Sequence, residues 1–178
     1  TFIKFGQILS SRPDLIPVNL LTELAKLQDN VPPFSFDEVA GIISSEFGRS
    51  HEEIFEYMDR TPIASASIGQ VHRAGLAGVG EVAVKIQRPG IHKLIEVDLE
   101  IMHHLATLAE THVEEIAPHR PVRIVEEFAK SLSKELDYSV EASNMERMAR
   151  QFASDRTVHI PGFFKDESSL RVLTMEFI

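Results

Sequence analysis

A seven-residue segment, 81–87, constrains the fold of this chain more than any other feature, because its apolar side chains alternate strictly. Val82, Val84 and Ile86 occupy every second position, the pattern of a β-strand with one buried face. Lys85 lies between the last two. A lysine in an apolar strand loses solvation if its side of the sheet is covered, and it then needs a carboxylate or an anionic ligand. The alternative is a lysine that simply points into water.

The residues before this strand predict the other arm of a hairpin. At Thr61 and Pro62 the helical pattern ends, and small side chains dominate 63–70. We expect a strand, a tight loop of small residues and a second strand that reaches about Leu76. A glycine-rich turn then leads into 81–87. In this antiparallel hairpin the lysine of one arm faces the small-residue loop of the other.

Residues 1–60 are predicted to form a helical extension. Ser35 with Glu38 has the spacing of a capping box, as does Ser50 with Glu53, and Gly48 fits a helix C-terminus. Apolar residues recur three and four positions apart, as an amphipathic helix requires. They are Phe2, Phe5, Ile8 and Leu9, and then Leu20, Leu21, Leu24 and Leu27. Residues 61–178 form the second predicted domain.

Two long helices and a last pair of strands are predicted after Pro89 and Gly90. The apolar stripe of the first helix is Ile91, Leu94, Ile95, Leu99, Met102, Leu105 and Leu108. The second helix follows Pro121 and buries Ile124, Phe128, Leu132, Leu136 and Val140. Residues 158–164 and 170–177 predict the strands. This order of elements predicts an α+β fold with an antiparallel sheet and long helices.

Composition excludes several classes of function. The chain has 178 residues, 43% of them hydrophobic, a formal charge of -9 and no cysteine. Disulfides, thiolate zinc sites and cysteine nucleophiles are therefore excluded, and the absence of a basic cluster argues against nucleic-acid binding. No spanning or signal segment is evident, so we expect a soluble piece. Because the chain starts at Thr1 and stops within an apolar run, we expect both ends to be cut.

Other patterns typical of catalytic or metal sites are incomplete. Glu100 and His103 form a single Glu-x-x-His, whereas a di-metal bundle needs a second copy. His51 lacks the second histidine of a zinc-protease helix. The serines of 64–70 are not placed in Gly-x-Ser-x-Gly. We therefore expect no metal site among these residues.

The strand lysine, the loop before it and the glutamates after it occur in the order of a protein-kinase small lobe. A protein kinase would have Gly-x-Gly-x-x-Gly in the loop, because absent side chains let backbone amides approach phosphates. This chain has alanine and serine there, so its loop should be stiffer. Glu135 and Glu141 are six residues apart and do not share a helix face, so only one of them can reach Lys85.

These residues resemble the UbiB family of atypical protein-kinase-like proteins, over nearly the whole chain. Lys4-Phe5-Gly6-Gln7 is similar to the family's Lys-x-Gly-Gln motif, and 64–72 to the alanine-rich loop that replaces the glycine-rich one. Lys85 matches the third-strand lysine. The segment 135–138, with Glu141, Ala142 and Asn144, resembles the Glu-x-Asp helix motif. Ser65 departs from the alanine common at its position.

The resemblance implies a role for each motif. Lys85 would donate to the α- and β-phosphates of ATP or ADP and pair with Glu141. Glu135 and Asp137 would contact Lys4 of the extension. Lys4, Gly6 and Gln7 would lie across the usual protein-substrate site and regulate access to it. The expected nucleotide-binding residues are Ala64, Ser65, Ala66, Ser67, Ile68, Gly69, Gln70, Val71, Ala83, Lys85, Met175 and Glu176.

At the level of the whole protein, the resemblance implies an atypical kinase or ATPase that supports ubiquinone or other isoprenoid-lipid biosynthesis. Met175 and Glu176 would approach the hinge, with the magnesium ligands and catalytic loops in a large lobe beyond it. Expected partners are the nucleotide and an isoprenoid lipid or proteins of lipid biosynthesis, in the cytoplasm or an organelle interior. Membrane contact would be peripheral. The alternative hypotheses are a non-catalytic module that responds to nucleotide or lipid, and a helical interaction domain.

Overall fold

The computed structural model describes residues 31–178, which fall into two compact units. One unit combines residues 31–89 with 134–178, and the described part of the other is 90–133. The domain boundary predicted from the sequence, after residue 60, falls inside the first of these units. The helices expected within residues 1–30, including Lys4, Gly6 and Gln7, lie outside the described residues.

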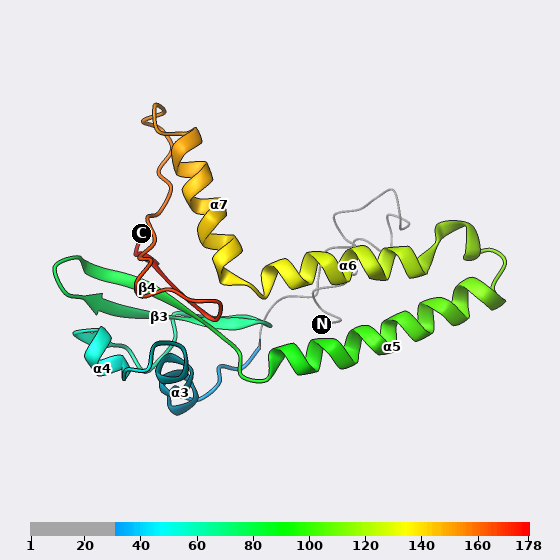
Figure 1. The fold of residues 1–178 in the computed structure, drawn as a ribbon, viewed down its shortest axis with the longest axis horizontal. Coiled ribbons are helices and arrows are strands. Elements are labelled where there is room, and N and C mark those ends of the chain that lie inside the picture. The colour runs from blue at the N-terminus through cyan, green and yellow to red at the C-terminus, as the bar shows by residue number, and fades with distance from the viewer. Residues whose placement is uncertain (1–30) are drawn as a thin grey trace. The chain divides into compact units, whose positions relative to one another are not determined.

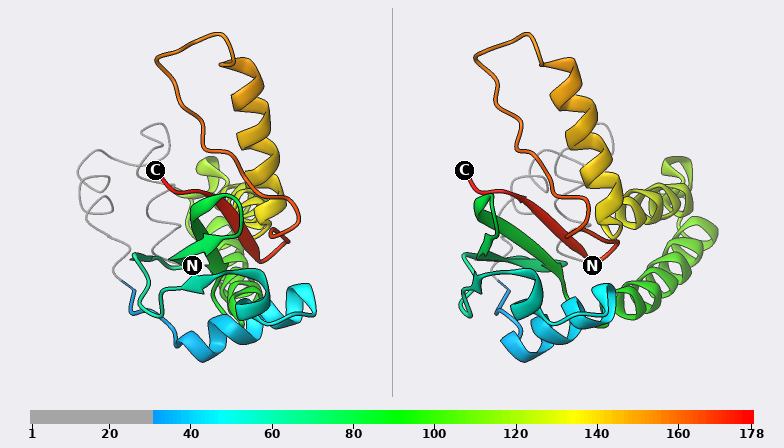
Figure 2. Two further views of the ribbon diagram at one scale, coloured as in Figure 1. Left: turned by 90° about the vertical axis from the view of Figure 1, so that its left-hand side faces the viewer. Right: turned by 60° about the vertical axis from the view of Figure 1, so that its left-hand side comes forward.

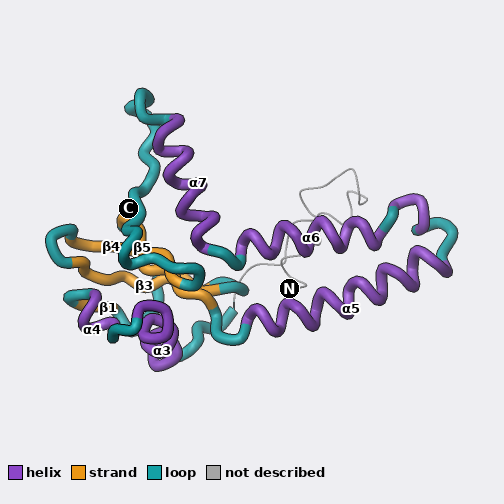
Figure 3. Tube along the Cα trace, in the orientation of Figure 1, coloured by secondary structure: helices purple, strands orange, loops and turns teal. Residues whose placement is uncertain are grey.

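An antiparallel sheet organises the first unit (Figures 1 and 3). Its long hairpin consists of β3 (Gly69–Leu76) and β4 (Gly80–Gln87), and β5 (Val172–Glu176) pairs with the other side of β4. Two short strands, β1 (Tyr57–Met58) and β2 (Ala64–Ser65), both pair with β3. The predicted hairpin is therefore confirmed, whereas β1 was missed within a stretch expected to be helical.

Alternation along β4 gives the sheet two different faces. Val82, Val84 and Ile86 are fully buried and pack with α3 (Phe36–Phe47), which contributes Val39 and Ile43 to the same core. Figure 2 shows α3 against this face and α7 (Tyr138–Gln151) on the other side of the sheet. Because α3 completes the core beneath the hairpin, residues 31–60 belong to the unit of the sheet.

Both predicted capping boxes are present. The Ser35 side chain accepts from the backbone N–H of Glu38, whose carboxylate accepts from Ser35, and α3 ends at Gly48 with a φ of 67°. That left-handed conformation favours glycine. Ser50 and Glu53 cap the short α4 (His51–Ile54). These local signals account for the two helices that precede the sheet.

The second unit contains a helical hairpin. Its helices are α5 (Ile91–His112) and α6 (Pro121–Glu135), separated by the 3₁₀ turn Ala117–His119. They lie side by side in Figure 1, and the Glu110 carboxylate accepts from the backbone N–H of Val122. None of the helices in residues 31–178 has the length and apolarity needed to cross a membrane.

The apolar stripe predicted for α5 is only partly buried. Ile91, Ile95 and Met102 are buried, but Leu105 and two further leucines of the stripe are more than half exposed. The reason is that α5 has two apolar sides. The exposed side is a row spaced three and four residues apart: Leu94, Val97, Ile101, Leu105 and Leu108.

The prediction of one long helix through Leu136 and Val140 is wrong. Helix α6 ends at Glu135, and α7 begins at Tyr138 after an extended residue, Asp137. The Asp137 carboxylate accepts hydrogen bonds from the backbone N–H and the hydroxyl of Ser139. A side chain that satisfies free amides at a helix start favours a new helix, and this local signal outweighs the continuous apolar spacing.

The predicted last pair of strands is also only half correct. Residues 172–176 form β5, but the residues before it contribute a single bridge, between Phe163 and Met175. The connecting turn is closed by Ser168, whose hydroxyl donates to the Phe164 carbonyl and accepts from the Thr174 N–H. These side-chain bonds replace part of the expected strand pairing.

The cap at Asp137 gives a stability prediction. Asp137→Ala should lower the free energy of unfolding by about 1 kcal/mol, because the backbone N–H and the hydroxyl of Ser139 at the start of α7 lose their acceptor. Asp137→Asn should cost much less, since asparagine caps about as well. Chemical denaturation of the full-length variants measures both. Equal losses from the two variants would contradict the assignment of Asp137 as a cap.

Candidate functional site

Lys85 is paired with Glu141. Its Nζ lies 2.6 Å from Glu141 Oε2, which joins β4 to α7 across 56 residues of sequence. The lysine side chain is 24% exposed and the glutamate side chain 40% exposed, so the pair is partly sheltered from water. The residue spacing left open whether Glu135 or Glu141 pairs with Lys85. Glu141 contacts the lysine, as the family resemblance implied.

An aromatic ring completes the surroundings of the ammonium group. Lys85 Nζ lies 4.7 Å from the centroid of the Tyr138 ring, which is fully buried. Tyr138 packs in a small cluster with Ala142 and Leu173. Helix α7 therefore supplies both a carboxylate and a ring face to the same lysine.

The strand register places several expected nucleotide-binding residues on one face of the sheet. Val71 pairs with Lys85, which in turn pairs with Leu173, and Ala83 pairs with Met175. Directly paired residues project from the same face, and so do residues two apart along a strand. Val71, Ala83 and Met175 therefore share the face of Lys85, opposite to the face covered by α3.

The small-residue loop is a tight turn held by Arg88. The Ala66 N–H donates to the Gly69 carbonyl over 2.8 Å, and the Arg88 backbone N–H donates to Ile68 O. The Arg88 guanidinium donates to the carbonyls of Ala66 and Pro32. Ser65, Ala66, Ser67 and Ile68 are half-buried, whereas Ala64 is exposed. These bonds support the expectation of a stiff loop.

Gln70 lies at the end of this loop but on the other face of the sheet. Its side chain is fully buried, and its carbonyl oxygen accepts from the Phe34 N–H. Its amide nitrogen donates to Phe34 O and lies 2.9 Å from His72 Nε2. Gln70 therefore ties the loop to the segment before α3, away from Lys85.

Glu176 also projects from the face opposite to Met175. Its carboxylate accepts from the Gly162 N–H and lies 2.9 Å from His159 Nε2. The hydrogen bond from Gly162 and that from His159 hold the pKa of Glu176 below its ordinary value. In this arrangement Glu176 anchors the segment that precedes β5.

The residues expected to contact the extension are split between two elements. Glu135 is half-buried at the end of α6, and Asp137 caps α7. Their expected partner Lys4, with Gly6 and Gln7, lies outside the described residues. The regulatory role of all five therefore stays a prediction.

Tyr138 has no role predicted from the sequence beyond membership of a motif. One signal was available, because Tyr138 lies three residues before Glu141 and so shares its side of a helix. A second missed feature is buried His72, whose Nδ1 lies 2.7 Å from the Asp59 carbonyl. Since a carbonyl only accepts, Nδ1 donates and Nε2 accepts from Gln70.

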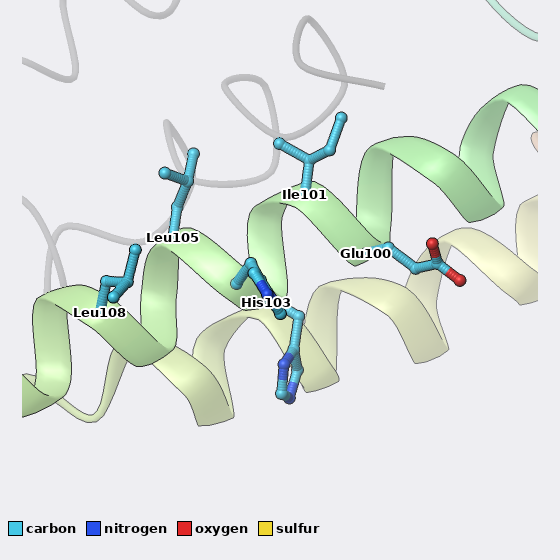
Figure 4. Close-up of a pocket in the computed structure, with 6 residues that line it drawn as sticks. Glu100, Ile101, His103, Leu105 and Leu108 are labelled. Atoms are coloured by element: carbon cyan, nitrogen blue, oxygen red, sulfur yellow. The ribbon is translucent and has the colours of Figure 1, made fainter.

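A separate hollow of about 560 Å³ lies along α5 in the helical unit. Its lining includes Ile101, Leu105 and Leu108, which project from one side of α5 in Figure 4, whereas Glu100 projects from another. The hollow is mainly apolar. Within residues 31–178, no group of three or more histidine, aspartate and glutamate side chains could hold a metal ion.

Comparisons with known proteins identify the family to which this chain is similar. A family model described as the ABC1 atypical kinase-like domain matches residues 26–178. The "Probable protein kinase UbiB" of Aeromonas hydrophila is 42% identical over 178 residues, which cover 99% of this chain and 33% of that protein. The chloroplastic ACTIVITY OF BC1 COMPLEX KINASE 1 of Arabidopsis thaliana is 43% identical over 179 residues, 100% of this chain and 26% of that protein.

A solved structure is similar as well. It is the complex of Rv3197 with erythromycin from Mycobacterium tuberculosis. The aligned region covers 97% of this chain and 43% of the chain in that structure, with a TM-score of 0.68 and 31% sequence identity. The predicted kinase-like fold with an antiparallel sheet is thereby confirmed. This chain spans about a third or less of the length of the two named kinase relatives.

Burial of His72 gives a pH prediction. Burial disfavours the charged ring and holds the pKa of His72 below its ordinary value of 6.5, against opposing effects of the Asp59 hydrogen bond and charge. Above pH 6.5 the ring is neutral in both folded and unfolded protein, so it adds no pH dependence. Below pH 6.5 the His72 side chain is protonated in the unfolded chain but stays neutral in the folded protein until a lower pH. Stability should therefore fall with acidification, by at most about 1.4 kcal/mol per pH unit from this group.

Chemical denaturation between pH 5 and 8 measures this effect. His72→Gln should flatten the acid side of the stability profile, whereas His119→Gln, at an exposed histidine, should leave its slope unchanged. Identical slopes in all three proteins would show that His72 charges as readily in the folded state as in the unfolded one.

Proposed function

The chain belongs to the ABC1 atypical kinase-like family, with UbiB relatives along its whole length, and on that premise we propose that it is the nucleotide-binding part of an atypical kinase or ATPase. The full-length protein would hydrolyse ATP or transfer its terminal phosphoryl group. The observation that carries this proposal is the contact between Lys85 and Glu141.

This contact suits phosphate binding for an electrostatic reason. A carboxylate beside a lysine in an apolar strand compensates the charge of the ammonium group and fixes its position. One N–H of the Lys85 ammonium group donates to Glu141. The other N–H groups can donate to the α- and β-phosphate oxygens. Kinases use a strand lysine and a helix glutamate in the same way.

The residues around Lys85 fit ATP or ADP. Val71, Ala83 and Met175 present an apolar surface on the same sheet face, which suits an adenine ring. The tight turn Ala64 to Gly69 would cover the phosphates. Magnesium, when bound with the nucleotide, would neutralise charge on the phosphates. We place its protein ligands in the part of the relatives that this chain does not span.

The biological setting is proposed from the names of relatives. UbiB points to ubiquinone biosynthesis, and we extend that role to this protein, with an isoprenoid lipid or an enzyme of its synthesis as partner. Chloroplastic relatives make an organelle interior a second candidate location beside the cytoplasm. Membrane contact would be peripheral.

The proposal predicts how substitutions change nucleotide binding. Lys85→Met in the full-length protein should weaken Mg-ATP binding about tenfold to a hundredfold, because a charge-assisted hydrogen bond contributes about 1.5–3 kcal/mol. Glu141→Gln should have a smaller effect in the same direction, since it keeps the shape and loses the charge. Isothermal titration calorimetry with Mg-ATP and Mg-ADP measures both.

A matched control is Lys130→Met, at an exposed lysine that also pairs with a glutamate. This variant should bind nucleotide like the unmodified protein. Unchanged affinity in Lys85→Met would overturn the proposed role of the lysine. If nucleotide binding depends on Lys85 but ATP is neither hydrolysed nor used for phosphoryl transfer, the non-catalytic regulatory module would be favoured over the enzyme.

A further inference from the structure

We infer that Tyr138 is a positioning residue: its ring supports the Lys85 ammonium group, and its hydroxyl end packs beside Gly69 at the end of the small-residue loop. Tyr138, Glu141 and Lys85 would then act as one unit that presents the lysine to phosphate. The consequence for nucleotide binding rests on the function proposed above. The placement of Lys85 on the ring does not depend on it.

The first observation is the contact itself. Lys85 Nζ lies 4.7 Å from the ring centroid, within the distance at which a cation is attracted to an aromatic face. Glu141 contacts the same Nζ from one helical turn further along α7. A carboxylate alone leaves a flexible lysine several orientations, and a ring beside it removes some of them.

The second observation concerns Gly69 at the end of the loop. A Cβ atom at position 69 would lie 2.5 Å from Tyr138 Oη and 2.5 Å from the Ile86 carbonyl oxygen. Both distances are far below van der Waals contact. The loop therefore reaches its place only because residue 69 has no side chain, and Tyr138 occupies part of the space that a side chain would need.

The third observation separates the ring from its hydroxyl. Tyr138 Oη is buried and forms no hydrogen bond with any residue from 31 to 178. A buried hydroxyl without a partner is unfavourable, so hydrogen bonding does not explain a tyrosine here. The ring is what contacts Lys85, and Tyr138→Phe should therefore keep that contact.

A purely structural role is the competing explanation. Tyr138 is part of a buried cluster with Ala142 and Leu173, so its removal will also reduce stability. A structural residue would affect thermal stability without a specific effect on Lys85. The two explanations differ in what happens to the lysine and in whether the effect on binding requires the lysine.

Nuclear magnetic resonance of the full-length protein with isotope-labelled lysine tests the placement without nucleotide. The Lys85 ε-methylene protons should show a ring-current shift and a nuclear Overhauser effect to the Tyr138 ring. Tyr138→Phe should retain the shift and Tyr138→Leu should abolish it. The absence of the Overhauser effect in the unmodified protein would overturn the inference, even if Tyr138→Leu did not fold.

Nucleotide titration tests the coupling through a double-mutant cycle. Tyr138→Leu should weaken Mg-ATP binding roughly tenfold, and Tyr138→Phe should restore it to within about twofold of the unmodified protein. In a Lys85→Met background, Tyr138→Leu should have no further effect on affinity. Full additivity of the two losses would contradict a role through Lys85.

Tyr57→Leu is the matched control, because Tyr57 also covers a strand glycine, Gly75, but no lysine within residues 31–178 lies on its ring. It should leave both the Lys85 resonances and the affinity unchanged. If the unmodified protein binds no nucleotide, the proposed function fails, whereas the resonance measurements still decide the role of Tyr138.

Discussion

The position of one ammonium group is the constraint on which the rest of the structure depends. Lys85 belongs to a strand whose other face is the core of the unit, and α7 brings it a carboxylate at 2.6 Å and the face of a ring. The glycine at the end of the loop leaves room for the hydroxyl of that tyrosine. The hairpin, the loop and α7 therefore share one contact region, and a shift of any of them would move the lysine.

The opposite face of the sheet anchors the end of the loop. Gln70 and His72 form a buried polar chain that joins the end of the loop to the backbone of Phe34 and Asp59. Every polar atom in this chain is bonded, so it holds the loop rather than binding a ligand. Two adjacent residues at the end of the same loop thus serve the two faces of the sheet: Gly69 accommodates Tyr138, and Gln70 anchors the residues before α3.

Much of this arrangement could be predicted from local patterns. Alternation identified β4 and placed Lys85 opposite the core, and the spacing of Ser35 and Glu38 located the start of α3. The break before Tyr138 was missed, because a continuous apolar spacing hid the cap at Asp137. The side of the sheet to which Gln70 points follows from strand register, which only tertiary pairing defines. The contact of Tyr138 with Gly69 likewise joins residues whose proximity no spacing reveals.

The most direct measurement is the reactivity of individual lysines in the full-length protein, followed by mass spectrometry after treatment with an amine-acylating reagent. With ATP at ten times its Kd, modification of Lys85 should slow roughly tenfold, while exposed Lys130 should react at an unchanged rate. Such selective protection would place the nucleotide on the lysine that Glu141 holds. Equal modification of Lys85 with and without ATP, under conditions where ATP is bound, would contradict the account.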